Sequence, residues 1–220
     1  MDLHKFTTAG VFIDSDAPSV IAFAKMTAIG VKDSRAAALR LYCTIRDTIT
    51  YDPYINLADP ASYRASAVLA AKRGFCVGKA SLLAASARAL GIPARVGYAD
   101  VRNHLSSPRL LETLKTDTFL WHSYAELYLS GRWIKATPAF DNALCARLGL
   151  KPLEFDGETD SLFHAFDQAG RRHMEYLNDR GSFFDVPFNA IMADFFKAYP
   201  DLMSGNGLAG DFRSEAVADR

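Results

Sequence analysis

Apolar residues in the first third of the chain recur every three or four positions, which is the spacing of one face of a helix. Between residues 33 and 52, Ala37, Leu41 and Ile45 keep a four-residue step. Ser34 stands where a cap is needed, because its hydroxyl can accept a hydrogen bond from the first free N–H groups. The pattern predicts one helix over this segment.

Two further helical patterns follow. The first covers roughly residues 66–73 and is broken by Gly74. The second begins near Cys76 and ends at Gly91 and Pro93, a pair that is typical of a helix C-terminus. A cysteine is therefore expected at the start of the third helix.

Beyond Pro93 the period of the apolar residues changes to two, the period of a strand. The alternation predicts strands at 94–101, 119–129 and 133–136. Ser130 and Gly131 separate the last two, so these strands are expected to form a hairpin with a tight turn.

The later segments are less regular. The pattern indicates a short helix or loop at 106–118, a helix at 142–148, apolar-polar segments at 153–158 and 172–177, a helix at 187–199, and a small polar tail from Gly205. Helices followed by antiparallel strands predict an α+β fold. We expect one domain over residues 1–220, with a catalytic core at about 33–141, an extension at 142–204 that completes the site, and a flexible end at 205–220.

Charge is balanced along the chain, since Lys plus Arg and Asp plus Glu each total 25 among 220 residues. No overall field then favours phosphate backbones or anionic lipid, so neither nucleic acid nor a membrane is an expected partner. Residues 1–16 lack a basic patch followed by an apolar run, and no stretch approaches the roughly 20 apolar residues of a membrane span. The expected location is the cytoplasm.

Three cysteines are present, Cys43, Cys76 and Cys145, and none belongs to a CxxC pair or a cluster with histidines. An odd number of unclustered thiols indicates a reducing compartment and no structural metal. Neither a metal nor an organic cofactor is expected.

Cys76 is a candidate nucleophile because it stands in the first turn of an apolar helix. Unpaired N–H groups and the helix dipole favour thiolate there and can lower a cysteine pKa from about 8.5 to about 3.5–7.5. Gly74 and Gly78 lack side chains that would hinder a substrate near the sulfur. The competing interpretation is a small buried hydrophobic residue in an alanine-rich helix.

His122 is the candidate base, since it lies early in a predicted strand rather than in a loop such as the one that carries His104. The expected hairpin places His122 opposite Ala139 and diagonal to Thr137 and Asp141. Either of the last two could orient the imidazole, as the third member of a nucleophile-base-orienter set does. Asp141 could also cap the following helix.

Three motifs together resemble those of bacterial transglutaminase-like proteins: Gly74-Phe75-Cys76-Val77, the exit Leu90-Gly91-Ile92-Pro93-Ala94-Arg95, and Trp121-His122-Ser123-Tyr124-Ala125-Glu126-Leu127-Tyr128 leading to Trp133. The resemblance runs from about residue 39 to 141 and implies a papain-like fold, with Cys76 as nucleophile and His122 as base. The family usually shows Asp-Pro a few residues after the Trp, whereas this chain has Thr137-Pro138. The third member is therefore expected to be Asp141, with Thr137 as the alternative.

The resemblance implies thiolate attack on an amide or other acyl carbonyl through a covalent thioester, as in transglutaminases, cysteine proteases, amidases and other hydrolases and acyltransferases. We expect hydrolysis rather than transfer, and a small-molecule or peptide acyl substrate. The expected substrate-binding residues are Gly74, Phe75, Tyr98, Trp121, His104 and His164. One alternative is carbonyl or carbon-carbon chemistry on a small molecule in the same pocket. Another is a catalytically degenerate module that binds a peptide or partner.

Overall fold

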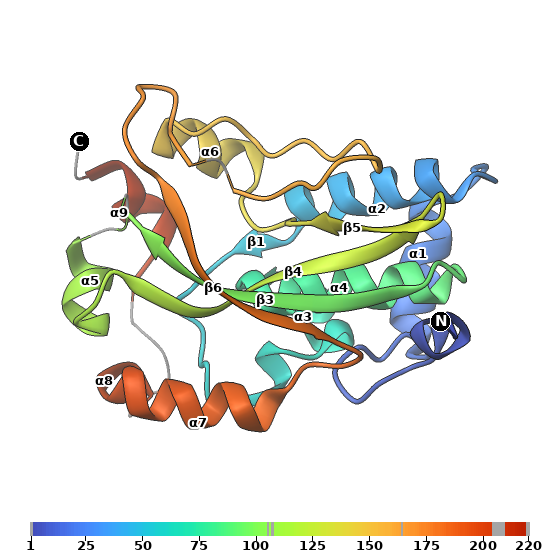
Figure 1. Ribbon diagram of the computed structural model, residues 1–220, viewed down its shortest axis with the longest axis horizontal. Helices are drawn as coiled ribbons and strands as arrows, with labels where there is room; N and C mark the ends of the chain where they lie inside the picture. Colours follow the sequence, from blue (N-terminus) through green and yellow to red (C-terminus); the bar gives the residue numbers. More distant parts are fainter. Residues whose placement is uncertain (1, 105, 107, 164, 204–209, 219–220) are drawn as a thin grey trace.

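A four-stranded antiparallel sheet lies at the centre of the computed structural model, which describes residues 2–104, 106, 108–163, 165–203 and 210–218 (Figure 1). Its strands, in spatial order, are β5 (Arg132–Ala136), β4 (Thr118–Leu129), β3 (Ala94–Asn103) and β6 (Met174–Phe183). A short parallel pair, β1 (Thr50–Tyr51) and β2 (Arg73–Gly74), stands apart from this sheet. The mixed architecture confirms the α+β prediction.

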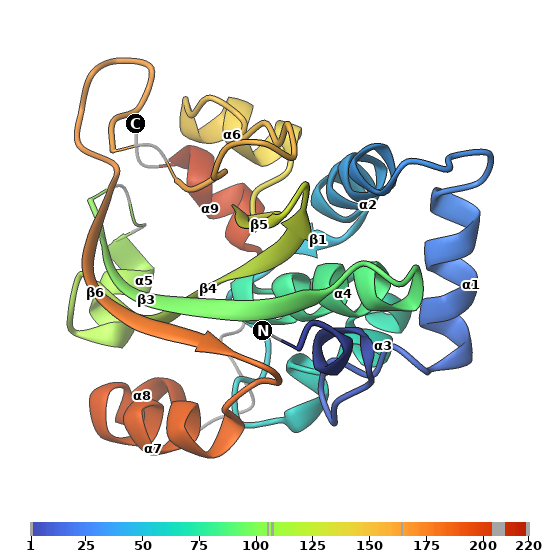
Figure 2. The same ribbon diagram turned by 45° about the vertical axis from the view of Figure 1, so that its right-hand side comes forward.

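Helices surround the sheet, as Figures 1 and 2 show. They are α1 (Pro18–Thr27), α2 (Ser34–Thr48), α3 (Ala65–Ala71), α4 (Cys76–Ala89), α5 (Pro108–Leu114), α6 (Asn142–Leu148), α7 (Phe188–Ala198), α8 (Pro200–Met203) and α9 (Phe212–Ala218), with 3₁₀ turns η1 (His4–Thr7) and η2 (Pro60–Ser62). Both views place α7 and α8 below the sheet and α6 above it. None of the described helices is long and apolar enough to cross a membrane.

Helix α4 is the central helix of the fold. It packs on β3 and β4 and is surrounded by α1, α2 and α3. Every side chain from Val77 to Arg88 is buried, which accounts for a sequence that is mostly small and apolar. Its first residue, Cys76, is thereby held on a rigid element.

The register of the β4–β5 hairpin is the expected one. Leu129 pairs with Arg132, and the pairing continues to Ala125 and Ala136. Ser130 and Gly131 have φ of 50° and 87°, the two left-handed residues of the turn that suits a right-twisted hairpin. The prediction for this turn is confirmed.

Two boundaries differ from the expectation. Helix α2 is capped by Asp33, whose carboxylate accepts a hydrogen bond from the N–H of Ala36 at 2.7 Å, and Ser34 is its first residue. The helix ends at Thr48 and not near residue 52, because the N–H of Thr50 donates to the carbonyl of Lys72 at 2.9 Å and starts β1.

The end of the chain, expected to be a flexible segment at 205–220, contains a helix. Residues 204–209 lie outside the described part, but Phe212–Ala218 form α9. The ring of Phe212 lies 5.8 Å from that of Tyr51 and 5.7 Å from that of Tyr54. Helix α9 therefore packs against the core through aromatic contacts. Its polar composition did not predict these contacts.

Candidate active site

Cys76 lies at the N-terminus of α4, at the end of a short irregular connection from α3. Lys72 closes α3 in a left-handed conformation, and Gly74 pairs with Tyr51 in the parallel β1–β2 ladder. Phe75, with φ of −94° and ψ of −175°, is the extended N-cap residue after which the helix begins. The backbone thus delivers the thiol at the first turn, as predicted.

The sequence suggested that Gly74 and Gly78 leave room for a substrate near the sulfur. The structure shows a different reason for these glycines, which is close packing. A Cβ on Gly78 would lie 2.5 Å from the carbonyl oxygen of Ser62, and one on Gly74 would lie 3.0 Å from Val68. Both positions allow close packing of the α4 start against the preceding loop and α3. Gly74 does not line the cavity beside Cys76.

His122 follows an irregularity in β4. Ala99 pairs with His122 whereas Val101 pairs with Phe119, so the two strands differ by one residue between these pairs. Trp121 occupies this β-bulge with φ of 59°, a left-handed conformation that costs a bulky residue about 1 kcal/mol or more. Such bulges re-aim the neighbouring side chain, here that of His122.

Cys76 and His122 line one cavity with a volume of about 90 Å³. Two other residues expected at the site, Phe75 and Trp121, also line it. His122 is only 6% exposed, and its ring packs against those of Phe163 and Tyr176, with centroids 5.1 and 6.3 Å away. The structure therefore brings the expected nucleophile, base and two aromatic neighbours together.

Burial raises the pKa of the Cys76 thiol to about 11, although the backbone N–H groups of Ser123, Val77 and Cys76 itself act in the opposite direction. The sequence predicted a lowered pKa from the helix N-terminus alone. Desolvation outweighs the helix because it disfavours any charged form. A thiol with a pKa of about 11 is neutral at pH 7.

Burial also lowers the pKa of His122 to about 4, with a smaller contribution in the same direction from His173. The imidazole is neutral at pH 7 and can accept a proton. Nε2 of His122 is buried and has no hydrogen-bond partner among the described residues. The resting pair is thus a neutral thiol and a neutral imidazole.

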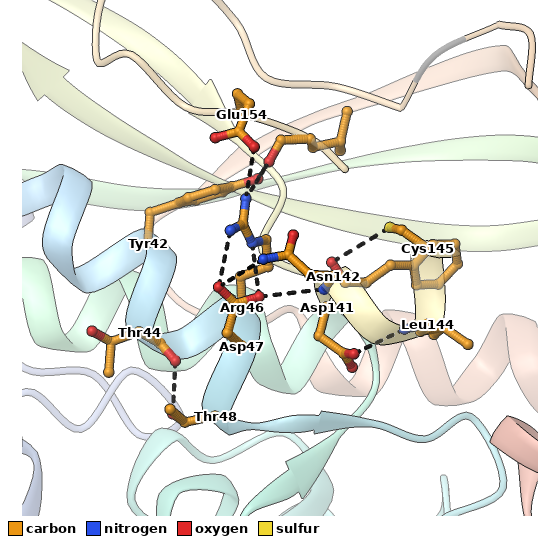
Figure 3. A network of polar contacts seen from close by, with 12 residues as sticks. Tyr42, Thr44, Arg46, Asp47, Thr48, Asp141, Asn142, Leu144, Cys145 and Glu154 are labelled. Atoms are coloured by element: carbon orange, nitrogen blue, oxygen red, sulfur yellow. Dashed lines mark hydrogen bonds and ion pairs between the residues drawn. The ribbon is translucent and has the colours of Figure 1, made fainter. Parts of the chain in front are cut away.

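Asp141 makes no hydrogen bond to the imidazole of His122 among the described atoms. Figure 3 shows it at the start of α6, where one carboxylate oxygen accepts from the N–H of Leu144 at 3.0 Å. The other oxygen pairs with the guanidinium of Arg213. The capping interpretation of Asp141 is confirmed, and both of its oxygens are engaged away from His122.

Thr137 follows β5 directly. Its backbone is fixed, because the carbonyl accepts from the hydroxyl of Tyr42 at 3.1 Å and the N–H donates to Ser161 at 3.1 Å. Its hydroxyl is buried and has no hydrogen-bond partner in the described part of the chain. Continuing the hairpin register puts Thr137 on the His122 face of β4.

The remaining expected residues lie elsewhere. Tyr98 is fully buried in the core, where its ring packs 5.4 Å from Trp121, and does not line the cavity. His104 lies beside a separate shallow pocket and 3.3 Å from Glu175. His164 falls outside the described residues.

The sequence pattern missed most of the cavity wall. Many of its apolar members come from four helices, α5, α7, α8 and α9, and from the segment between β5 and β6. They include Leu110, Phe140, Phe163, Phe195, Leu202 and Phe212. The extension at 142–204 was expected to complete the site, but the apolar side of the helix expected at 187–199 did not indicate which of its residues would lie near Cys76.

The described residues hold no group of three or more His, Cys, Asp or Glu side chains suited to a metal. Comparison with known proteins gives one family. A model described as the transglutaminase-like superfamily matches residues 21–138, more than half of the chain. This match contains both Cys76 and His122 and confirms the resemblance inferred from their motifs.

Two solved structures are similar to this chain. One is a putative cysteine protease from Cytophaga hutchinsonii, with 19% identity and a TM-score of 0.53 over 86% of this chain and 50% of that chain. The other is a putative protease from Parabacteroides distasonis, with 17% identity and a TM-score of 0.43 over 60% and 26%. The similarity to the first structure shows the fold. This chain covers about half of the first protein and about a quarter of the second. A search of curated proteins finds no match.

Proposed function

The chain belongs to the transglutaminase-like superfamily, and on this premise we propose that it is a cysteine-dependent enzyme that attacks an amide or other acyl carbonyl. Cys76 is the nucleophile, His122 is the base, and the acyl group is held as a thioester on Cys76. Hydrolysis of this thioester is preferred to transfer of the acyl group to another acceptor.

One observation carries the proposal. The thiol at the start of α4 and the imidazole on β4 line the same cavity, although they are 46 residues apart in sequence (122 minus 76). A nucleophile and a base on two rigid elements, converging on an enclosed space, is the arrangement that covalent catalysis needs.

The neutral resting pair requires general-base catalysis. As the sulfur forms its bond to the acyl carbon, the thiol proton passes to His122, which then gives it to the leaving group when the carbon-heteroatom bond breaks. A water attacks the thioester next, with His122 taking its proton and returning it to the sulfur, so a carboxylic acid is released and the enzyme is restored. The backbone N–H of Cys76 is the assigned donor to the oxyanion.

The third member of the set is assigned by comparing the hydrogen-bond partners of the two candidates, Asp141 and Thr137. Both oxygens of Asp141 are bound to Leu144 and Arg213, whereas the hydroxyl of Thr137 is buried and without a partner among the described atoms. No hydrogen bond joins this hydroxyl to His122 among the described atoms. We assign Thr137 the orienting role because its hydroxyl is uncommitted and the hairpin register puts it on the His122 face of β4, and a hydroxyl supports an imidazolium less well than a carboxylate does.

Two pairs of variants test the proposal with chromogenic esters and anilides as substrates. Cys76→Ala is expected to abolish turnover and the initial burst, whereas Cys43→Ala, on α2, retains both. His122→Ala is expected to lower turnover by roughly 10²–10⁴, the usual contribution of a positioned base, and His104→Ala serves as its control. Full turnover by Cys76→Ala would refute the proposal. Release of a product other than an acid or acyl adduct would favour carbonyl or carbon-carbon chemistry instead.

A further inference from the structure

The wall around the Cys76 sulfur is apolar to an extent that an ordinary peptide-binding cleft does not require. Among the described residues that line the cavity there is no Asp, Glu, Lys or Arg. Leucine and phenylalanine side chains predominate, as represented by Leu114, Phe119 and Phe195. A charged group entering this space would lose its water without finding an ionic partner.

Two polar groups on the wall, the Tyr199 hydroxyl and the Trp121 indole, form hydrogen bonds within the protein. The hydroxyl of Tyr199 accepts from the N–H of Leu120 at 2.7 Å and donates to the carbonyl of Thr118 at 2.8 Å. The indole N–H of Trp121 donates to Asp194 at 2.8 Å. These groups therefore add little polar recognition for a substrate.

Much of this wall lies outside the segment that matches the family. The match ends at residue 138, and Phe140, Phe163, Phe195, Leu202 and Phe212 all follow it. Helices α7, α8 and α9 carry the last three. The chain thus closes the cavity with its own C-terminal segment, and this segment sets which acyl group can lie beside the sulfur.

We infer that the substrate of this site carries an uncharged, apolar acyl group, aliphatic or aromatic, that fills the cavity beside Cys76. The inference rests on the proposed function, because it takes the acyl carbonyl to be attacked by this thiol. It excludes substrates with a carboxylate or ammonium on the acyl side chain, since no described wall residue would neutralise that charge.

A series of p-nitrophenyl esters tests the inference on the unmodified protein. In each reaction the Cys76 sulfur bonds to the acyl carbon, the thiol proton passes to His122 and from there to the departing nitrophenolate, and water then attacks the thioester, with His122 returning its proton to the sulfur as the acid is released. The rate constant kcat/KM is expected to rise about fourfold per methylene (~0.8 kcal/mol) from acetate until the cavity is full. The monoester of glutaric acid is expected to react at least about 100-fold more slowly than hexanoate.

Two leucine variants, one inside the cavity and one outside it, test whether the cavity sets the preference for acyl chain length. Leu202→Ala, on α8 and 6% exposed, is expected to shift the best substrate toward longer chains, whereas Leu177→Ala, on β6 and 42% exposed, leaves the profile unchanged. Equal rates for glutarate and hexanoate, or a flat chain-length profile, would overturn the inference even if Cys76 is acylated.

Binding to the Cys76→Ala protein gives a second readout that does not depend on the chemistry. Calorimetry is expected to show binding of hexanamide and none of glutaramate at the same concentration. If no ester acylates Cys76 but hexanamide still binds selectively, the proposed function fails while the apolar specificity of the cavity stands. Selective binding of glutaramate would overturn the specificity.

Discussion

The carboxylate of Asp100 accepts a hydrogen bond from the backbone N–H of Trp121 at 3.1 Å, directly before His122. The same carboxylate lies 2.5 Å from Nε of Arg180, whose NH1 lies 2.6 Å from Asp194. The guanidinium also stacks 4.4 Å from the centre of the Trp121 ring. These contacts stabilise the left-handed conformation of Trp121, so they fix the point from which His122 projects.

Asp100→Asn is therefore expected to lower kcat by roughly 10- to 100-fold, because a small displacement of a catalytic group has effects of this size. The rate of Cys76 alkylation should change little, since Cys76 lies on α4. Asp117→Asn is the control, as Asp117 pairs with Arg102 at 3.0 Å on the surface. Unchanged kcat in Asp100→Asn would show that the bulge holds without this carboxylate.

Lys79 is the most deeply buried lysine of the described chain, and its Nζ donates to the carbonyls of Arg46, Ile49 and Ala139 at 3.0, 2.6 and 2.8 Å. Lys79→Met leaves three buried acceptors without their donor. We expect a loss of about 3 kcal/mol in the free energy of unfolding, measured by urea denaturation.

Lys115→Met is the matched control for Lys79, because its side chain is 70% exposed and pairs with Asp201. This substitution should change the free energy of unfolding by no more than about 0.5 kcal/mol. A loss of the same size in both variants would mean that the three carbonyl contacts of Lys79 add no particular stability.

The pKa of His122 gives the free energy of unfolding a defined pH dependence. Its value is about 4 in the folded protein and about 6.5 in the unfolded chain. Below pH 6.5 the unfolded chain takes up a proton that the folded protein refuses, so stability falls as the pH falls, by about 3 kcal/mol between pH 6.5 and 4. His122→Gln should remove this component. Parallel curves for the wild type and the variant would show that the pKa of His122 is the same in the folded protein and the unfolded chain.

Thr137 and Asp141 can be separated by two nearly isosteric changes. Thr137→Val is expected to lower turnover by more than about tenfold and to shift its pH profile, because it removes the hydroxyl that is assigned to orient the imidazole. Asp141→Asn is expected to spare turnover and to cost about 1 kcal/mol of stability, since Arg213 loses its charged partner. The reverse pattern would assign the orienting role to Asp141.

Much of the fold could be predicted from periodicity. The spacing of Ala37, Leu41 and Ile45 and the alternation around His122 correspond to α2 and β4, and the Ser130-Gly131 turn fixed the hairpin register correctly. These features depend on local spacing, which one sequence contains. The thiol at the start of α4 was predictable for the same reason.

The rest depends on contacts between distant residues. A single residue in a left-handed conformation, Trp121, interrupts β4 without changing the alternation around it. The direction of the Cys76 pKa shift depends on which side chains bury the sulfur. Two residues of its cavity, Phe140 and Phe212, are distant from Cys76 in the sequence. The N-terminus of α4 was visible in the sequence, whereas the burial that outweighs it was not.

The covalent intermediate on Cys76 is the most direct measure of the proposed chemistry. Wild-type protein mixed with p-nitrophenyl hexanoate, quenched in acid within the burst and digested, should give one acylated peptide, the one that contains Cys76, and hydroxylamine should remove the acyl group as expected of a thioester. Cys43 and Cys145 provide internal controls in the same digest. An acyl group on either of these cysteines, or turnover with no acylated Cys76 at any time in the burst, would contradict the account.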